Sequence, residues 1–219
     1  MIRSDDIFID IDIKRFEKIC KIIRHYGFDH IIGVTLLGEG KKLWNDNQIE
    51  AFLFWRILFR TNINSLTNFR IKRKLGTKFI GENNQLLKLL DSEFSKYGAI
   101  PALHGLHHYK YNRMPQNKLF EELSVGKKLL ERLLSLGIEI FVPPFNLWDK
   151  RTEFVCRQLC LSVDKCTTGF ENLIRNMNDS QIKQLAKQQR STSEVYCHPQ
   201  RLESLQKFEI YLKTRRKYF

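Results

Sequence analysis

The chain has 219 residues, of which 42% are hydrophobic and 28% charged, and its formal net charge is +13 at pH 7. This composition is typical of a globular protein with one substantial core, and the lack of an apolar run of about 18 residues excludes a membrane span. The positive charge favours an anionic partner, such as an anionic polysaccharide or a phosphate-bearing sugar carrier.

Short apolar runs alternate with amphipathic segments along the whole chain. The apolar runs predict strands, and the segments with apolar residues at helical spacing predict helices, two of which end at Gly27 and Gly98. This alternation predicts an α/β fold with a parallel sheet, either doubly wound or an incomplete β/α barrel, in one domain over residues 1–219. The expected strands are 1–4, 30–38, 99–105, 138–144, 161–164 and 194–199, and the expected helices are 13–27, 49–60, 84–98, 117–137, 152–160, 179–189 and 201–216.

The cysteine content predicts a reducing compartment. The number of cysteines is odd and none forms a C-x-x-C pair, which favours reduced thiols over a disulfide framework. The first residues are charged and lack the apolar core of a secretory signal, so we expect a cytoplasmic protein. The cysteines are Cys20, Cys156, Cys160, Cys166 and Cys197.

Four groups of residues follow predicted strands. Asp5 and Asp6 come after the first strand, which at four residues spans only about 13 Å and is minimal. The segment HGLHH occupies residues 104–108, FVPPFN occupies 141–146, and His198 ends the last strand. Because the carboxyl ends of parallel strands meet at one edge, we expect these groups to lie together.

The residue types suit metal-assisted hydrolysis. Histidines at i and i+4, here His104 and His108, can face one divalent ion, and a carboxylate can complete the ligand set. A second carboxylate can serve as a base and a separate histidine as an acid.

The order of these four motifs resembles that of the NodB-like polysaccharide deacetylases, a type of carbohydrate esterase family 4. The matching segments are Arg3–Asp6, His104–His108, Phe141–Asn146 and Tyr196–His198, so the resemblance spans nearly the entire chain. The resemblance implies a distorted or incomplete (β/α)7 barrel. It also implies a hydrolase that removes acetyl from an N-acetylated sugar, which is a polysaccharide, an oligosaccharide or a precursor.

The resemblance assigns roles to five residues. Asp6, His104 and His108 would bind a divalent metal, with zinc as the first expectation and cobalt, manganese or nickel as alternatives. Asp5 would be the general base that accepts a proton from water. His198 would be the general acid that protonates the departing amine.

The third motif would contribute to the oxyanion and substrate site. The backbone N–H of Phe145 would stabilise the tetrahedral oxyanion together with the metal, and Asn146 follows it in the same segment. Trp148 or Asp149, just beyond the motif, is expected to shape the groove.

One position departs from the family pattern. Val142 occupies the place of the arginine that pairs with the base in the family, which leaves Arg3 as the candidate partner of Asp5. Asp164 is the candidate for the aspartate that the family places near its catalytic histidine. His107 is the histidine outside the motif, and we interpret it as a contact to a metal ligand or to the substrate.

Three other functions compete with the deacetylase hypothesis. A weak or inactive barrel could bind carbohydrate without cleaving it. The basic runs Arg70 to Lys74 and Lys213 to Tyr218 could bind nucleic acid, although such runs are more often solvated faces. Asp10 and Asp12 form a D-x-D pair that could hold the metal of a nucleotide-sugar-dependent glycosyltransferase. The sequence does not indicate an oligomeric state.

Overall fold

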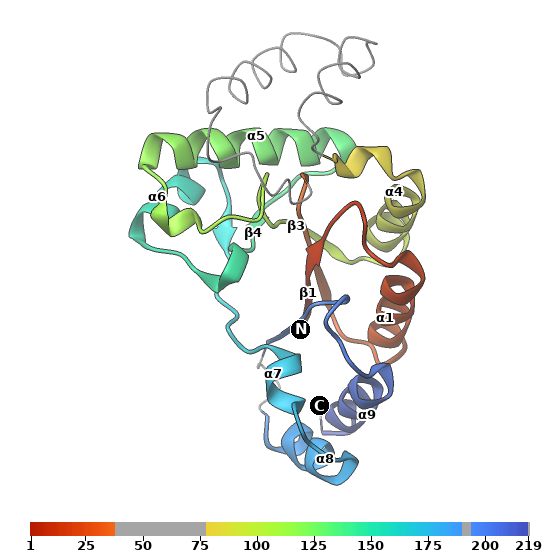
Figure 1. Cartoon of the computed structure of the whole chain (residues 1–219). Coiled ribbons are helices and arrows are strands. Elements are labelled where there is room, and N and C mark those ends of the chain that lie inside the picture. The colour runs from red at the N-terminus through yellow and green to blue at the C-terminus, as the bar shows by residue number, and fades with distance from the viewer. Residues whose placement is uncertain (38–77, 190–193, 219) are drawn as a thin grey trace.

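The computed structural model describes residues 1–37, 78–189 and 194–218. In this part of the chain, six parallel strands form one sheet in the order β5-β4-β3-β2-β1-β6, which curls into a half-barrel (Figure 1). The expected incomplete β/α barrel is thereby confirmed. The strands are β1 (Ile2–Ile7), β2 (His30–Val34), β3 (Ile100–Leu103), β4 (Ile140–Phe141), β5 (Ser162–Val163) and β6 (Val195–Cys197).

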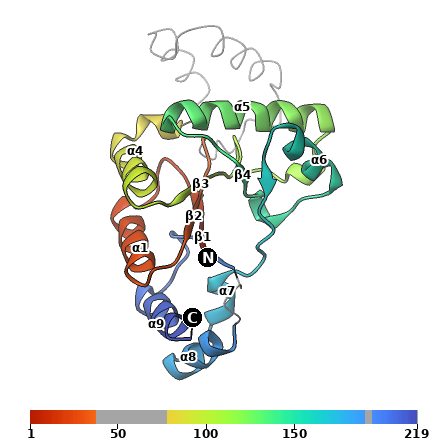
Figure 2. The same ribbon diagram turned by 180° about the vertical axis from the view of Figure 1, so that it is seen from behind.

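Helices surround the curled sheet on its outer side. Helices α4, α1 and α9 follow one another along one flank, α5 and α6 continue around the sheet, and α7 and α8 lie at the end beside α9 (Figures 1 and 2). The helices are α1 (Ile13–His25), α4 (Asn84–Asp91), α5 (Gln116–Leu134), α6 (Lys150–Gln158), α7 (Phe170–Ile174), α8 (Asp179–Gln188) and α9 (Leu205–Arg216). Short helical turns are η1 (Ile80–Glu82), η2 (Ser92–Lys96, a π-turn), η3 (Tyr111–Arg113) and η4 (Pro144–Asn146).

Side-chain caps explain where several helices begin. Asp12 accepts a hydrogen bond from the N–H of Arg15 at the start of α1, and Asn83 does the same for α4. The predicted ends at Gly27 and Gly98 agree with the structure, because both glycines have the positive φ that follows a helix.

The core consists of two main apolar clusters. The larger packs α1, α4, α5 and α6 against β2, β3 and β4, and includes Phe16, Val34, Leu103, Leu123 and Phe141. The second joins the other side of α1 to β6, α7, α8 and α9, and includes Ile23, Phe170, Ile182, Val195 and Phe208. The outer face of the sheet is therefore buried under helices.

The first strand is longer than the sequence analysis expected. β1 runs to Ile7 and contains both aspartates, and its pairing with β2 shifts register between Ser4 and Ile7. Asp6 has φ 59°, so a local irregularity rather than the end of the strand turns its side chain. Helix α7 was not predicted, because five residues are too few for a helical pattern to emerge.

Several sequence expectations concern other parts of the chain. The predicted helix 49–60 and the basic run 70–74 lie outside the described residues. All five cysteines are free and only Cys160 is exposed. None of the helices described here combines the length and apolar character needed to cross a membrane.

Candidate metal centre

The carboxyl ends of four strands bring the predicted site residues together. Asp5 and Asp6 lie near the end of β1, His104 directly follows β3, and His198 directly follows β6. β2 lies between β1 and β3 and contributes Gly33, where a Cβ atom would lie 3.5 Å from both Asp5 Oδ1 and His104 Cβ. A small residue there leaves the two neighbouring side chains room to meet.

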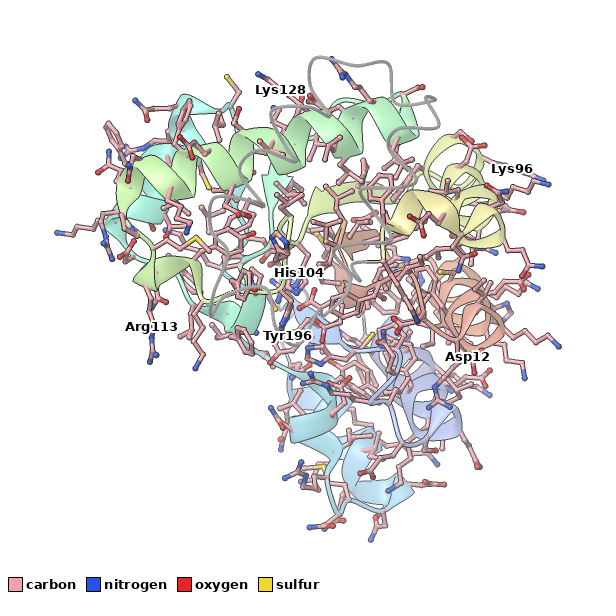
Figure 3. All side chains as sticks on the ribbon, turned by 45° about the horizontal axis from the view of Figure 1, so that its top comes forward. Asp12, Lys96, His104, Arg113, Lys128 and Tyr196 are labelled. Carbon is pink, nitrogen blue, oxygen red and sulfur yellow. The ribbon has the colours of Figure 1, made fainter. Side chains whose placement is uncertain are left out.

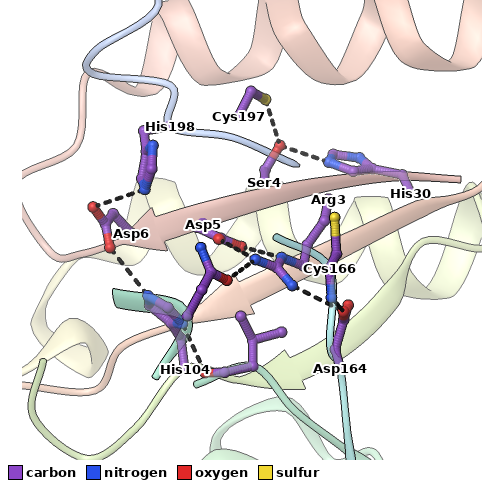
Figure 4. Close-up of polar contacts among 12 residues, drawn as sticks. Arg3, Ser4, Asp5, Asp6, His30, His104, Asp164, Cys166, Cys197 and His198 are labelled. Atoms are coloured by element: carbon purple, nitrogen blue, oxygen red, sulfur yellow. Dashed lines mark hydrogen bonds and ion pairs between the residues drawn. The ribbon is translucent and has the colours of Figure 1, made fainter. Parts of the chain in front are cut away.

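Three of these side chains converge on one point. Asp6 Oδ1 lies 3.1 Å from His104 Nε2 and 2.9 Å from His108 Nε2, and all three residues are largely buried (Figure 4 shows Asp6 and His104). Figure 3 places His104 in the interior of the molecule, whereas Lys96, Arg113 and Lys128 extend from its periphery. The i, i+4 histidines and the second aspartate of the first motif thus form one cluster.

Gly105 makes the turn between the two histidines possible. Its φ is +104°, and a Cβ atom there would lie 2.5 Å from the His107 carbonyl oxygen and 2.6 Å from Tyr111 Oη. The Tyr111 hydroxyl in turn donates to that carbonyl and accepts from the N–H of Leu106. The turn is therefore fixed by hydrogen bonds from a buried tyrosine.

The polar contacts of His104 fit a bound divalent cation. Its Nδ1 lies 2.8 Å from the carbonyl oxygen of Val142, which can only accept, so Nδ1 carries the proton. In the neutral ring Nε2 is then a lone pair that faces the Asp6 carboxylate, and a cation between them satisfies both atoms. Burial raises the pKa of Asp6, but its close contacts with the His104 and His108 imidazoles outweigh burial and hold that pKa well below its usual range.

Asp5 is held by a different partner. Arg3 Nε and Nη2 each donate to one Asp5 carboxylate oxygen at 2.8 Å, and both side chains are buried (Figure 4). Arg3 Nη1 also pairs with Asp164 at 2.9 Å, and Nη2 donates to Asn146 Oδ1 at 2.6 Å. Arg3 thus orients Asp5 where Val142 supplies no cation.

His198 is oriented by a carboxylate that the sequence analysis did not identify. Its backbone N–H donates to Glu171 Oε1, its Nδ1 lies 3.7 Å from the same oxygen, and its Nε2 lies 3.6 Å from Asp6 Oδ2. Burial lowers the pKa of His198, but the contact with Glu171 and the charges of Asp6 and Asp5 raise it above its ordinary value overall. Asp164, expected beside this histidine, contacts Arg3 instead.

The third motif forms one wall of the site. Phe145 and Asn146 both have left-handed backbone angles, with φ 59° and 52°. The Phe145 ring is 50% exposed, and its centroid lies 4.4 Å from that of the His108 ring. Lys110 Nζ lies 5.4 Å from the same ring, so an aromatic face and a cation border the cluster.

Three further residues from the sequence analysis lie outside this cluster. His107 Nδ1 lies 3.3 Å from Glu122 on α5 and is not among the three grouped ligands. Asp149 is the N-cap of α6 and forms a capping box with Thr152. Asp12 of the D-x-D pair caps α1 and lies apart from His104 (Figure 3).

Asp6 has two more neighbours from the segment after β6. Gln200 Nε2 donates to the Asp6 backbone carbonyl at 2.7 Å, and Arg201 Nη2 lies 3.4 Å from Asp6 Oδ2. The Arg201 side chain is 65% exposed and can leave the carboxylate at little cost. No sequence signal marked either residue or Glu171, because each is defined only by its contact with a distant strand end.

No protein-family model matches the sequence, and no curated protein matches it. Several solved structures, in contrast, match the fold of the chain. A family 4 carbohydrate esterase from Streptomyces lividans, in complex with acetate, superimposes with a TM-score of 0.62 at 12% identity, over 97% of this chain and 85% of that one. The chitin deacetylase of Colletotrichum lindemuthianum gives a TM-score of 0.56 at 12% identity, over 98% and 80% of the two chains.

An inactive protein shares the same fold. A family 4 carbohydrate esterase pseudoenzyme from Bacillus anthracis gives a TM-score of 0.60 at 9% identity, with 99% of this chain but only 59% of that chain covered. These similarities extend over nearly all of the present chain. The chain therefore has the NodB-like fold of the family 4 carbohydrate esterases.

Proposed function

We propose that this protein is a metal-dependent deacetylase that removes the acetyl group from an N-acetylated sugar. The observation that carries the proposal is the meeting of three groups at one edge of the sheet. These groups are the Asp6, His104 and His108 cluster, the Arg3–Asp5 ion pair, and His198 with its Glu171 partner. Metal-assisted hydrolysis of an amide uses a cation site, a base and an acid in this proximity.

Asp6, His104 and His108 would hold a divalent cation, with zinc the first candidate and cobalt, manganese or nickel the alternatives. When bound, the cation would polarise the acyl oxygen and activate the attacking water. The Val142 carbonyl keeps His104 in the tautomer whose Nε2 is free to bind.

Asp5 would be the general base. Its two hydrogen bonds from Arg3 fix the carboxylate in one orientation, in which it would accept a proton from the attacking water. Arg3 therefore takes the role of the arginine that Val142 replaces. Asp164 pairs with the remaining Arg3 nitrogen, Nη1, and Asn146 Oδ1 accepts a second hydrogen bond from Nη2.

His198 would be the general acid. The raised pKa of His198 keeps its ring protonated at higher pH, so it can give a proton to the departing amine nitrogen. Glu171 both raises that pKa and holds the backbone of His198.

The third motif would bind the substrate. The backbone N–H of Phe145 would donate to the developing oxyanion. The exposed ring of Phe145 offers an apolar face of the kind that packs against a sugar. Lys110 beside it and the net charge of +13 would suit an anionic or carrier-linked saccharide.

We place this activity in one catalytic domain over residues 1–219, in the cytoplasm. The five free thiols support a reducing compartment.

Acetate release from N-acetylglucosamine oligomers and from a precursor-type N-acetyl sugar tests the proposal. Metal-free protein should be inactive, and added Zn²⁺ or Co²⁺ should restore release. Asp5→Asn should lose at least about 10²-fold in kcat while retaining the metal. A metal-reconstituted protein that binds these sugars but releases no acetate would instead support an inactive carbohydrate-binding barrel.

A further inference from the structure

A second cluster of potential metal ligands lies at the opposite end of β2. Cys20 comes from α1, His30 is the first residue of β2, and Glu93 lies in the η2 turn after α4. Each offers one ligand atom within 4.8 Å of the other two, and their exposed fractions are 0%, 4% and 1%. The cluster shares no residue with the Asp6 site, which lies at the carboxyl ends of the strands.

Two atoms of this cluster lack the hydrogen bonds that buried polar atoms require. His30 Nε2 lies 2.8 Å from Ser4 Oγ (Figure 4), and Glu93 Oε1 is paired with Arg24. The other atom of each group, His30 Nδ1 and Glu93 Oε2, is buried and has no hydrogen-bond partner within the described ranges. Because such atoms are costly when unpaired, a small polar species between them would relieve both.

We propose that Cys20, His30 and Glu93 bind a structural divalent cation of the zinc class. A thiolate, an imidazole and a carboxylate together suit Zn²⁺ or Co²⁺, whereas Mg²⁺ and Ca²⁺ prefer oxygen ligands alone. Ser4 Oγ would accept a hydrogen bond from the His30 Nε2–H, which leaves the Nδ1 lone pair for the ion. Metal-binding histidines are commonly fixed in this way by a second partner.

Two of the three ligands would be anionic when the ion is bound. On binding, Cys20 would release its proton to solvent, so that its thiolate and the Glu93 carboxylate both face the two positive charges of the ion. With the paired Arg24 included, the group then carries one net positive charge. Arg24 keeps its pairing with the other Glu93 oxygen.

The ion would connect three elements that are distant in sequence. Glu93 lies in the η2 π-turn, and its backbone carbonyl accepts a hydrogen bond from the N–H of Ala99, just before β3. The cluster therefore connects α1, β2 and the segment that leads into β3. A buried water is the competing occupant, since it could bond to Nδ1 and Oε2. A bound water does not require the Cys20 sulfur as a ligand. A signal that depends on this sulfur therefore distinguishes a bound cation from a bound water.

Cobalt substitution tests this proposal independently of catalysis. A sulfur ligand gives Co²⁺ an intense charge-transfer absorption in the near ultraviolet, whereas the Asp6, His104 and His108 site holds only oxygen and nitrogen. A Cys160→Ser background removes the exposed thiol. In that background the band should appear, should persist in the control Cys156→Ala, which removes another buried helical thiol, and should vanish in Cys20→Ala.

Zinc content gives a second readout. The double variant His104→Ala, His108→Ala should retain about one zinc per chain, and adding Cys20→Ala should reduce that to none. Glu93→Gln keeps the sulfur but should weaken the cobalt titration at least tenfold. The proposal is overturned if saturating Co²⁺ produces no sulfur band, if the band survives Cys20→Ala, or if Glu93→Gln titrates like the background.

Discussion

Arg3 and Asp5 form an ion pair inside the protein, in which two guanidinium nitrogens each lie 2.8 Å from one carboxylate oxygen. Residues i and i+2 of a strand point to the same face, so the strand itself brings these two side chains together. The family resemblance places the partner of the base in the third motif. In this chain, Arg3 lies on the same strand as Asp5, the proposed base.

Replacing Arg3 by lysine tests this arrangement. Lysine keeps the charge but cannot make the bidentate contact of a guanidinium, so Asp5 loses its fixed orientation. Asn146 and Asp164 also lose their partner. We expect kcat to fall by about 10- to 100-fold, with metal content unchanged. Kinetics and elemental analysis measure the two quantities, and full activity in Arg3→Lys would remove Arg3 from its positioning role.

The sequence predicted the architecture because its signals are local. Alternating apolar runs and helical spacing identify β/α units, and the rule that function lies at the carboxyl ends of strands directed attention to Asp6, His104 and His198. Capping residues and glycines likewise determine helix ends within a few positions.

Contacts between residues that are distant in the sequence could not be predicted from these local patterns. Glu171 lies 27 residues before His198 and belongs to a helix of five residues, so neither periodicity nor motif spacing marks it. The length of β1 was missed because two adjacent aspartates ordinarily end a strand. In the folded chain both are buried, one by Arg3 and the other by two histidines.

Gly105→Ala should disrupt the metal cluster through the backbone. A methyl group at this position would collide with the His107 carbonyl and the Tyr111 hydroxyl, and φ +104° is unfavourable for alanine. We expect a loss of about 1–3 kcal/mol in unfolding free energy and weaker metal binding. Denaturant unfolding and zinc titration check both, with Gly98→Ala as the matched control.

Gly98 also has a positive φ, but a Cβ atom there meets nothing within 4 Å. The control variant should therefore lose stability through its backbone while binding zinc as the wild type does. Equal zinc affinity in both glycine variants would contradict a specific role for the turn at Gly105.

The Asp149→Ala variant should distinguish a structural role of Asp149 at the start of α6 from a role in shaping the substrate groove. The Asp149 side chain accepts from the N–H of Thr152 at the start of α6 and also pairs with Arg151. We expect a loss of about 0.5–2 kcal/mol in unfolding free energy with kcat/KM unchanged. A clear rise in KM with unaltered stability would show instead that Asp149 contacts the substrate.

Glu171→Gln should change the pH dependence of the reaction. Glu171 raises the pKa of His198, so glutamine, which carries no charge, should lower it. The acid must be protonated to act, and kcat/KM falls as pH rises through its pKa, so the alkaline limb of the profile should move to lower pH. The glutamine oxygen can still accept the His198 N–H, which keeps the loss of kcat/KM at lower pH well below the roughly 10²–10⁴-fold contribution of a general acid.

His198→Gln, by comparison, should lose activity at every pH. An alkaline limb that stays in place in Glu171→Gln would show that another group sets it, and would remove His198 from the acid role.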